Sequence, residues 1–113
     1  MYTTAIGMMS DFEYQRFGNA VSTEISPTSR YFECDLLIID DLGTEIANQF
    51  TVTTLYNVID TRLKTGKSML ISTNLSPDEM RKRYWDRITS RIFGEFHVLG
   101  FAGIDVRQQK LKV

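Results

Sequence analysis

The sequence predicts an α/β fold in which helices cover a parallel sheet. Four large aliphatic residues in succession, at 36–39, form an apolar run without alternation, which is typical of a strand buried on both faces. A second short apolar run, at 69–71, follows a segment with helical periodicity. Strand and helix patterns therefore alternate along the chain, and this order favours parallel strands joined by right-handed crossovers.

The composition is that of one globular domain with a modest core, since the chain has 113 residues of which 42% are hydrophobic. A net charge of −1 excludes an overall basic surface, so any contact with nucleic acid must be a local patch. The single cysteine, Cys34, excludes an internal disulfide, and no cation or helix start beside it in the sequence favours a reactive thiol. We find no membrane-spanning run and no signal peptide, and we predict a soluble cytoplasmic protein.

The amino-terminal part is predicted to hold a strand, a helix and the central strand. Residues 1–6 are rich in strand formers and end at Gly7. Ser10 and Glu13 have the spacing of a capping box, which predicts a helix over about 11–17 with Gly18 as its stop. Residues 19–30 are interpreted as a loop or frayed helix, and 31–32 as the lead into the strand at 35–40. Core packing is expected of Met8, Met9, Phe12 and Phe17.

The carboxyl-terminal part is predicted to hold three helices and two strands. Apolar residues with helical spacing indicate an amphipathic helix over 50–64, closed by Gly66, and a strand follows at 67–73. Ser76-Pro77-Asp78-Glu79 has the cap, the proline and the acids of a helix start. Asp86 is expected to cap a further helix with Ile88 and Ile92 on its buried side and Gly94 at its end. A last strand is predicted at 95–101, before a polar, basic tail.

Polar residues end both central strands. Asp40 and Asp41 follow the first strand and Asn74 follows the second, and neighbouring parallel strands direct such residues into one crevice. There Asp40 would hold Mg²⁺ through water, Asp41 would orient or deprotonate an attacking water, and Asn74 would position that water. Phosphoryl transfer needs this kind of positioning and charge neutralisation. The alternatives are a solvated Asp-Asp turn and a simple turn asparagine.

Other polar residues have structural interpretations as well as functional ones. Thr65-Gly66-Lys67-Ser68 is rejected as a phosphate-binding loop, because Thr61 stands where a glycine is required and a helix precedes it. Arg87 and Arg91 share a helix face, which is either solvated or reaches a nucleotide on a neighbouring subunit. His97 is interpreted as structural. Tyr84 and Trp85 are interpreted as core packing at a helix junction, with base stacking as the alternative.

Three motifs together resemble the AAA+ ATPases of the DnaC/DnaI helicase-loader and IstB-like type. They are Leu-Leu-Ile-Ile-Asp-Asp-Leu-Gly-Thr-Glu at 36–45, Ser-Thr-Asn-Leu-Ser at 72–76 and Asp-Arg-Ile-Thr-Ser-Arg-Ile at 86–92. The match covers about residues 31–110. The resemblance implies a three-layer P-loop NTPase fold, with the chain forming a single partial AAA+ domain over 1–113.

The resemblance also assigns roles and partners. Asp40 matches the Walker B magnesium residue, Asp41 the catalytic acid, and Asn74 sensor 1. Arg87 resembles the arginine finger that acts on a neighbouring subunit, with Arg91 as the other choice, and Arg107 is similar to the sensor 2 arginine. Family members use ATP and Mg²⁺, form homo-oligomers through their nucleotide interfaces, and load a ring-shaped replicative helicase onto single-stranded DNA.

One departure from the family pattern is large. The P-loop strand, its glycine-rich turn and the following helix are expected before Met1 and do not occur in this sequence. We therefore predict that this chain alone binds ATP poorly and is inactive as an ATPase, although its parent hydrolyses ATP. Loss of that strand is expected to leave unpaired edges, so that the last strand shifts or another chain fills the gap.

The leading hypothesis is a fragment of an ATP-dependent DNA replication protein that loads the replicative helicase. An IstB-like transposition helper ATPase is the alternative within the same class. From another class comes a non-enzymatic module that contacts DNA or a partner through its basic helices, which carry Arg81, Lys82 and Arg83.

Overall fold

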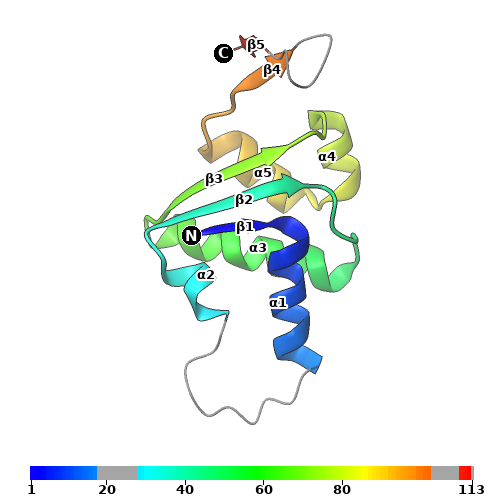
Figure 1. The fold of residues 1–113 in the computed structure, drawn as a ribbon. Coiled ribbons are helices and arrows are strands. Elements are labelled where there is room, and N and C mark those ends of the chain that lie inside the picture. Colours follow the sequence, from blue (N-terminus) through cyan, green and yellow to red (C-terminus); the bar gives the residue numbers. More distant parts are fainter. Residues whose placement is uncertain (18–27, 103–109, 113) are drawn as a thin grey trace.

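A computed structural model describes residues 1–17, 28–102 and 110–112. Its main sheet has three strands, β1 (Tyr2–Thr4), β2 (Leu36–Leu42) and β3 (Ser68–Thr73), in the order β1-β2-β3. Both strand pairs are parallel, as predicted, and β2 lies in the centre. The helices are α1 (Ala5–Phe17), α2 (Ser29–Glu33), α3 (Gln49–Lys64), α4 (Pro77–Arg83) and α5 (Asp86–Glu95) (Figure 1).

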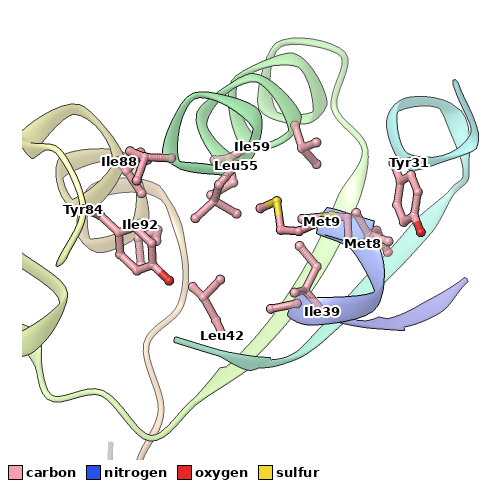
Figure 2. Packing of buried hydrophobic residues seen from close by; sticks show 14 of the residues in the cluster. Met8, Met9, Tyr31, Ile39, Leu42, Leu55, Ile59, Tyr84, Ile88 and Ile92 are labelled. Carbon is pink, nitrogen blue, oxygen red and sulfur yellow. The ribbon is translucent and has the colours of Figure 1, made fainter. Parts of the chain in front are cut away.

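The hydrophobic core lies between one face of this sheet and the helices. Leu37 and Ile39 of β2 are fully buried, and Figure 2 shows Ile39 and Leu42 pointing toward Leu55 and Ile59 of α3. The other face is open in the described part of the chain, since Leu36 and Leu70 are 43% and 53% exposed. The sequence predicted helices on both faces of the sheet, but in the described part of the chain they cover one face only. Residues of β2 accordingly alternate between buried and partly exposed.

Two helix predictions in the carboxyl-terminal half are confirmed in detail. Helix α3 runs to Lys64 and is closed by Gly66 at φ 70°, so Gly66-Lys67-Ser68 is a helix stop followed by a strand. The Lys67 side chain is paired with a carboxylate, since its Nζ lies 3.8 Å from Asp35 Oδ1. Helix α4 begins with the predicted capping box, in which Ser76 and Glu79 accept each other's backbone N–H groups. Ile88 and Ile92 are buried, as predicted.

The predicted start of the first helix is wrong by six residues. Helix α1 begins at Ala5 and not at Asp11, because the Thr4 hydroxyl accepts the Gly7 N–H at 2.9 Å and caps the helix there. The strand predicted at 1–6 is accordingly reduced to β1. The earlier start brings Met8 and Met9 into the core, where they are 0% and 2% exposed. The predicted stop at Gly18 lies outside the described residues.

The residues predicted to lead into the central strand instead form helix α2. Tyr31 is buried, and the Phe12 ring of α1 packs against both Tyr31 and Phe32, with centroids 5.4 and 5.9 Å apart. This aromatic packing favours a helical turn over the extended backbone that the β-forming side chains suggested. The central strand begins only at Leu36.

The last strand, predicted at 95–101, also differs. Helix α5 continues through Gly94 to Glu95, where an Arg91–Glu95 ion pair supports its final turn, and Asp86 is its first residue and not its cap. Residues 96–99 have no regular structure, and β4 is Gly100–Ala102. It pairs antiparallel with β5 (Lys110–Lys112), apart from the main sheet (Figure 1). The expected shift of the last strand is thus observed, and β3 pairs only with β2 among the described strands.

Candidate functional site

A β-bulge brings the two acids to the carboxyl end of β2. The β2–β3 register runs evenly to Ile39 and Ile71 and resumes at Leu42 and Thr73, so Asp40 and Asp41 together oppose a single residue of β3. Asp41 has φ 58°, the left-handed region that side chains rarely adopt and that aspartate tolerates better than most. Such backbone strain is concentrated at functional sites, which makes this end of the sheet the first candidate.

Two hydroxyls of β3 join the strand ends. The Ser72 hydroxyl donates to Asp40 Oδ1 and accepts the Asp41 N–H at 3.1 Å, so one side chain holds both residues of the bulge. The Thr73 hydroxyl donates to the Leu42 carbonyl at 2.5 Å and accepts the Leu75 N–H at 3.1 Å. The acids of β2 and the polar end of β3 therefore form one hydrogen-bonded unit.

Asp40 is held on the open face of the sheet by neighbours from both adjacent strands. The Tyr2 hydroxyl of β1 donates to Asp40 Oδ2 at 2.7 Å, and Ser72 of β3 donates to the other oxygen. The Ser72 hydrogen bond first, and then that of Tyr2, hold the pKa of Asp40 below its ordinary value. The hydrogen bond between Tyr2 and Asp40 raises the pKa of Tyr2. Asp40 is therefore ionised at neutral pH.

The donor set fits a magnesium ion held mainly through water. Each Asp40 oxygen accepts one hydrogen bond from the protein and has a further lone pair for a water of the ion's shell. The Asp41 side chain is exposed at the same strand end. No group of three metal-ligating acids, histidines or cysteines occurs in the described ranges. Mg²⁺ is usually bound by one or two carboxylates together with substrate phosphates, and this site offers that number.

The loop after Asp41 is folded back onto it. The Thr44 hydroxyl donates to the Asp41 carbonyl at 2.7 Å, and the Gly43 N–H donates to the carboxylate of Glu45 at 2.8 Å. Gly43 has φ 110°, and a Cβ there would lie 2.8 Å from the side chain of Leu75, so only glycine fits this turn. The loop thereby holds the Asp41 carbonyl, while Ser72 holds the Asp41 N–H.

Glu45 anchors this loop in the protein interior. It is 4% exposed, and its carboxylate accepts a hydrogen bond from the Tyr84 hydroxyl at 2.6 Å. Burial first, and then this carboxylate, raise the pKa of Tyr84, so the phenol stays protonated and keeps donating. The Arg83 guanidinium donates to the Glu45 carbonyl. The junction of α4 and α5 is thus tied to the loop that carries the acids.

The other residues predicted for the site lie at different places. Asn74 is exposed directly after β3, at the same sheet edge as the acids. Arg87 on α5 is exposed, with its guanidinium 5.9 Å from the centre of the Tyr56 ring. Arg91 forms ion pairs with Asp60 of α3 and with Glu95, and these carboxylates raise its pKa. Arg107 lies outside the described residues. Arg87 is therefore more available to an external partner than Arg91.

Sequence analysis missed several residues that shape this region. Ser72 and Tyr2 had no assigned role, although the period-2 alternation of strands places both on the same sheet face as Asp40. The sequence also gave no sign of a cation beside Cys34. In the structure the buried Arg62 guanidinium lies 3.3 Å from Cys34 Sγ, so that expectation is corrected.

Comparisons with known proteins identify the fold. The AMPPCP-bound DnaA of Aquifex aeolicus matches with a TM-score of 0.67 over 87% of this chain, at 20% identity. A structure described as a DNA replication initiation factor matches with a TM-score of 0.66 over 87% of this chain, at 19% identity. The replication initiator DnaA bound to AMPPCP and single-stranded DNA gives 0.63 over 83% of this chain, at 19% identity. This chain spans 28–30% of the length of those chains.

The fold is therefore that of part of an AAA+ P-loop NTPase domain, as predicted. These three structures are of replication initiators, so the structural comparison does not confirm the helicase-loader branch that the motifs resemble. No protein-family profile matches the chain, and no curated protein does. None of the described helices is long and apolar enough to cross a membrane.

Proposed function

We propose that the chain is part of a cytoplasmic, ATP-dependent DNA replication protein of the AAA+ class. The observation that carries the proposal is the hydrogen-bonded unit at the strand ends, in which Ser72 joins Asp40 and Asp41. An AAA+ fold that gathers acids at this sheet edge is suited to a metal-bound nucleoside triphosphate. Two of the structural neighbours contain the ATP analogue AMPPCP, which agrees with a nucleotide ligand.

Each polar residue of the strand ends has a proposed part in this function. Asp40, kept ionised by its hydroxyl donors, holds the water shell of Mg²⁺. Asp41, whose side chain is exposed, orients the attacking water or accepts a proton from it. Asn74, at the end of the next strand, positions that water. The magnesium ion supplies neutralisation of the phosphate charge. Arg87 acts on the nucleotide of a neighbouring subunit in a homo-oligomer, and Arg107 contacts the nucleotide of its own subunit.

Within this class we propose a helicase loader of the DnaC/DnaI type, with a replicative helicase and single-stranded DNA as partners. The support is the motif Asp40-Asp41-Leu42-Gly43-Thr44-Glu45. Its glycine is required by the Leu75 contact and its glutamate is the buried anchor of the loop. An IstB-like transposition helper is the second candidate, because the same motifs support it. Stimulated loading of a purified replicative helicase onto circular single-stranded DNA favours the loader, and stimulated strand transfer by a transposase favours the helper.

The experiment that tests the nucleotide site measures ATP hydrolysis by a protein that contains this chain together with a phosphate-binding loop. We expect Asp41→Asn to abolish hydrolysis while magnesium-dependent ATP binding remains, because the exposed acid is used in the reaction more than in binding. Asp40→Asn should weaken the magnesium dependence of binding. Arg87→Ala should lower hydrolysis only under conditions in which the protein assembles.

The matched control is Asp35→Asn, which changes an exposed carboxylate at the amino end of β2, away from the acids. It should leave hydrolysis unchanged. Hydrolysis that survives Asp41→Asn at the wild-type rate would contradict the assignment of the catalytic acid. For this chain by itself, titration calorimetry with ATP and Mg²⁺ should give no binding in the micromolar range.

A further inference from the structure

A fully buried cation lies at the amino end of the sheet. Arg62 of α3 is 0% exposed, and its Nε has no hydrogen-bond partner among the described residues. Its Nη1 and Nη2 donate to the backbone carbonyls of Tyr31 and Ser68, at 3.0 and 2.6 Å. In the described ranges no carboxylate forms an ion pair with this guanidinium. Because a buried charge is costly without an opposite charge, the site favours an anion beside Arg62.

The thiol of Cys34 is in contact with this cation. Arg62 Nη1 also donates to Cys34 Sγ, at 3.3 Å. The other polar contact of the sulfur is weaker, since it lies 3.5 Å from the Leu36 carbonyl, which already accepts from the Met1 amino group at 2.8 Å. Of the three groups that accept hydrogen bonds from Arg62, two are carbonyls and only the thiol can ionise. A thiolate at Cys34 would supply the missing anion.

The position of Cys34 also leaves it open to reagents. Cys34 lies between α2 and β2 and is partly exposed, whereas the Arg62 that contacts it is fully buried. The other charges nearby are at the surface: Glu33 and Asp35 are exposed, and Lys67 is paired with Asp35. Charges in contact with water are screened by solvent and salt, and a buried charge is screened much less. Arg62 is therefore expected to dominate the field at the sulfur.

We propose that Cys34 is a modification site, at which a thiolate stabilised by Arg62 forms a mixed disulfide with small disulfides. The thiolate is the form of cysteine that attacks a disulfide sulfur. A bond forms between Cys34 Sγ and one sulfur of the small disulfide, and the bond between the two sulfurs of that molecule breaks. The other half leaves as a thiolate and takes a proton from water. The Cys34 sulfur is oxidised and the leaving sulfur is reduced, so no further oxidant is needed.

The modification has a consequence for the fold. In the mixed disulfide the sulfur is neutral, so Arg62 again lacks an anion, and the adduct competes with the bond that joins Arg62 to the segment between α2 and β2. The modified chain should therefore be less stable than the reduced chain. This site lies at the opposite end of β2 from Asp40 and Asp41, and it needs neither ATP nor Mg²⁺.

Cys34 is the only cysteine, so all thiol chemistry of the chain reports on it. The test mixes the whole chain at pH 7 with an excess of dithiodipyridine, a neutral aromatic disulfide, and follows the absorbance of the released thiopyridone. The reference is a peptide of residues 31–37, which keeps Glu33 and Asp35 but lacks Arg62. A free thiol is only a few per cent ionised at this pH, and a more stable thiolate is a weaker nucleophile. We therefore expect the folded chain to react between about threefold and thirtyfold faster than the peptide.

Unfolding and substitutions locate the cause of this reactivity. In urea, where Arg62 no longer lies beside the thiol, the chain should react at the rate of the peptide in the same solvent. Arg62→Met should likewise react like the peptide, at urea concentrations where circular dichroism shows that it is folded. The matched controls are Arg30→Met and Lys67→Met, which remove exposed or partly exposed cations and should react like the wild type. A Gly-Ser extension before Met1 moves the free amino group away and should also leave the rate unchanged.

The effect on stability is measured separately. The chain is modified with glutathione disulfide, the single adduct is verified by the mass of the intact chain, and urea denaturation is followed by circular dichroism. The adduct should lower the urea midpoint, and reduction with dithiothreitol should restore it. An unchanged midpoint would overturn the proposed competition for Arg62.

The reaction rates decide the proposal itself. It is overturned if the folded chain reacts no faster than the peptide, a comparison that requires no variant. It is also overturned if folded Arg62→Met keeps the wild-type rate. Loss of the enhanced rate on extension before Met1 would assign the effect to the amino group and overturn the role of Arg62.

Discussion

The two ends of the three-stranded sheet are built on opposite principles. At the amino end a buried cation, Arg62, is surrounded by neutral groups: its guanidinium donates to the carbonyls of Tyr31 and Ser68 at 3.0 and 2.6 Å and to Cys34 Sγ. At the carboxyl end two acids are presented on a strained bulge, with hydroxyls as their partners. The first arrangement joins segments of the chain, and the second leaves negative charge available.

This difference separates structure from function within a single sheet. Arg62 is 0% exposed and its donors bond to Tyr31 of α2, to Ser68 of β3 and to Cys34 between α2 and β2, so its charge serves to assemble the fold. Asp41 is exposed and its backbone costs energy to hold, which is expected only where the charge is used. Disruption of the amino end should therefore affect stability, and disruption of the carboxyl end should mainly affect ligand binding and hydrolysis.

The largest effect is expected from Arg62→Met. Removal of the guanidinium leaves the buried carbonyls of Tyr31 and Ser68 without their donor, and each unsatisfied group is costly. We expect the free energy of unfolding to fall by about 3 kcal/mol, measured by urea denaturation followed by circular dichroism. The control is Arg30→Met, whose side chain is 59% exposed beside Asp11 and should cost no more than about 1 kcal/mol. Equal stability of the two variants would remove the structural role of Arg62.

An intermediate effect, of opposite sign, is expected from Asp41→Gly. Glycine adopts φ 58° without a Cβ penalty, so the free energy of unfolding should rise by about 1 kcal/mol in the same denaturation experiment. The parent protein should lose ATP hydrolysis at the same time, as is common where strain serves function. At Asp35, which has no positive φ, the same change to glycine should lower stability. Destabilisation by Asp41→Gly would mean that the bulge is not strained.

The smallest effect is a pH dependence that originates at Asp40. Its pKa is lowered in the folded state from the ordinary value of 3.8, so its stabilising contribution is present above about pH 4 and is lost as the pH falls through the folded-state pKa. The urea midpoint of the wild type should therefore fall more steeply below pH 4 than that of Asp40→Asn. Ser72→Ala removes the main cause of the shift and should lie between the two. Identical profiles for all three proteins would contradict the shift.

The parts of the fold that were predictable are those specified by neighbouring residues. The capping box at Ser76 and Glu79 and the apolar stripe of α3 depend on contacts three or four residues apart, and both are confirmed. The helix at Tyr31 was missed, because it depends on packing between Phe12, Tyr31 and Phe32. The start of α1 was missed although its cap is local, because Thr4 was assigned to a strand and its hydroxyl instead accepts the Gly7 N–H. The last strand was misplaced because side-chain propensity at 95–101 does not reveal whether a partner strand is present.

The candidate site followed the same rule. The sequence placed Asp40 and Asp41 at the end of a strand, and Asn74 at the end of the next, because the runs that precede them are unambiguous. The hydroxyls that hold Asp40 come from residues 32 and 38 positions away, and no local pattern identifies them. The bulge could not be predicted from the sequence either, because an aspartate at position 41 does not indicate a left-handed backbone as a glycine would.

The hydroxyl of Ser72 couples both acids of β2 to the end of β3. It bonds to the side chain of one acid and to the backbone of the other, two residues before Asn74 on its own strand. A displacement of the end of β3 would therefore reach both acids through one side chain. The positions of the two acids are thereby coupled to the strand that leads to Asn74.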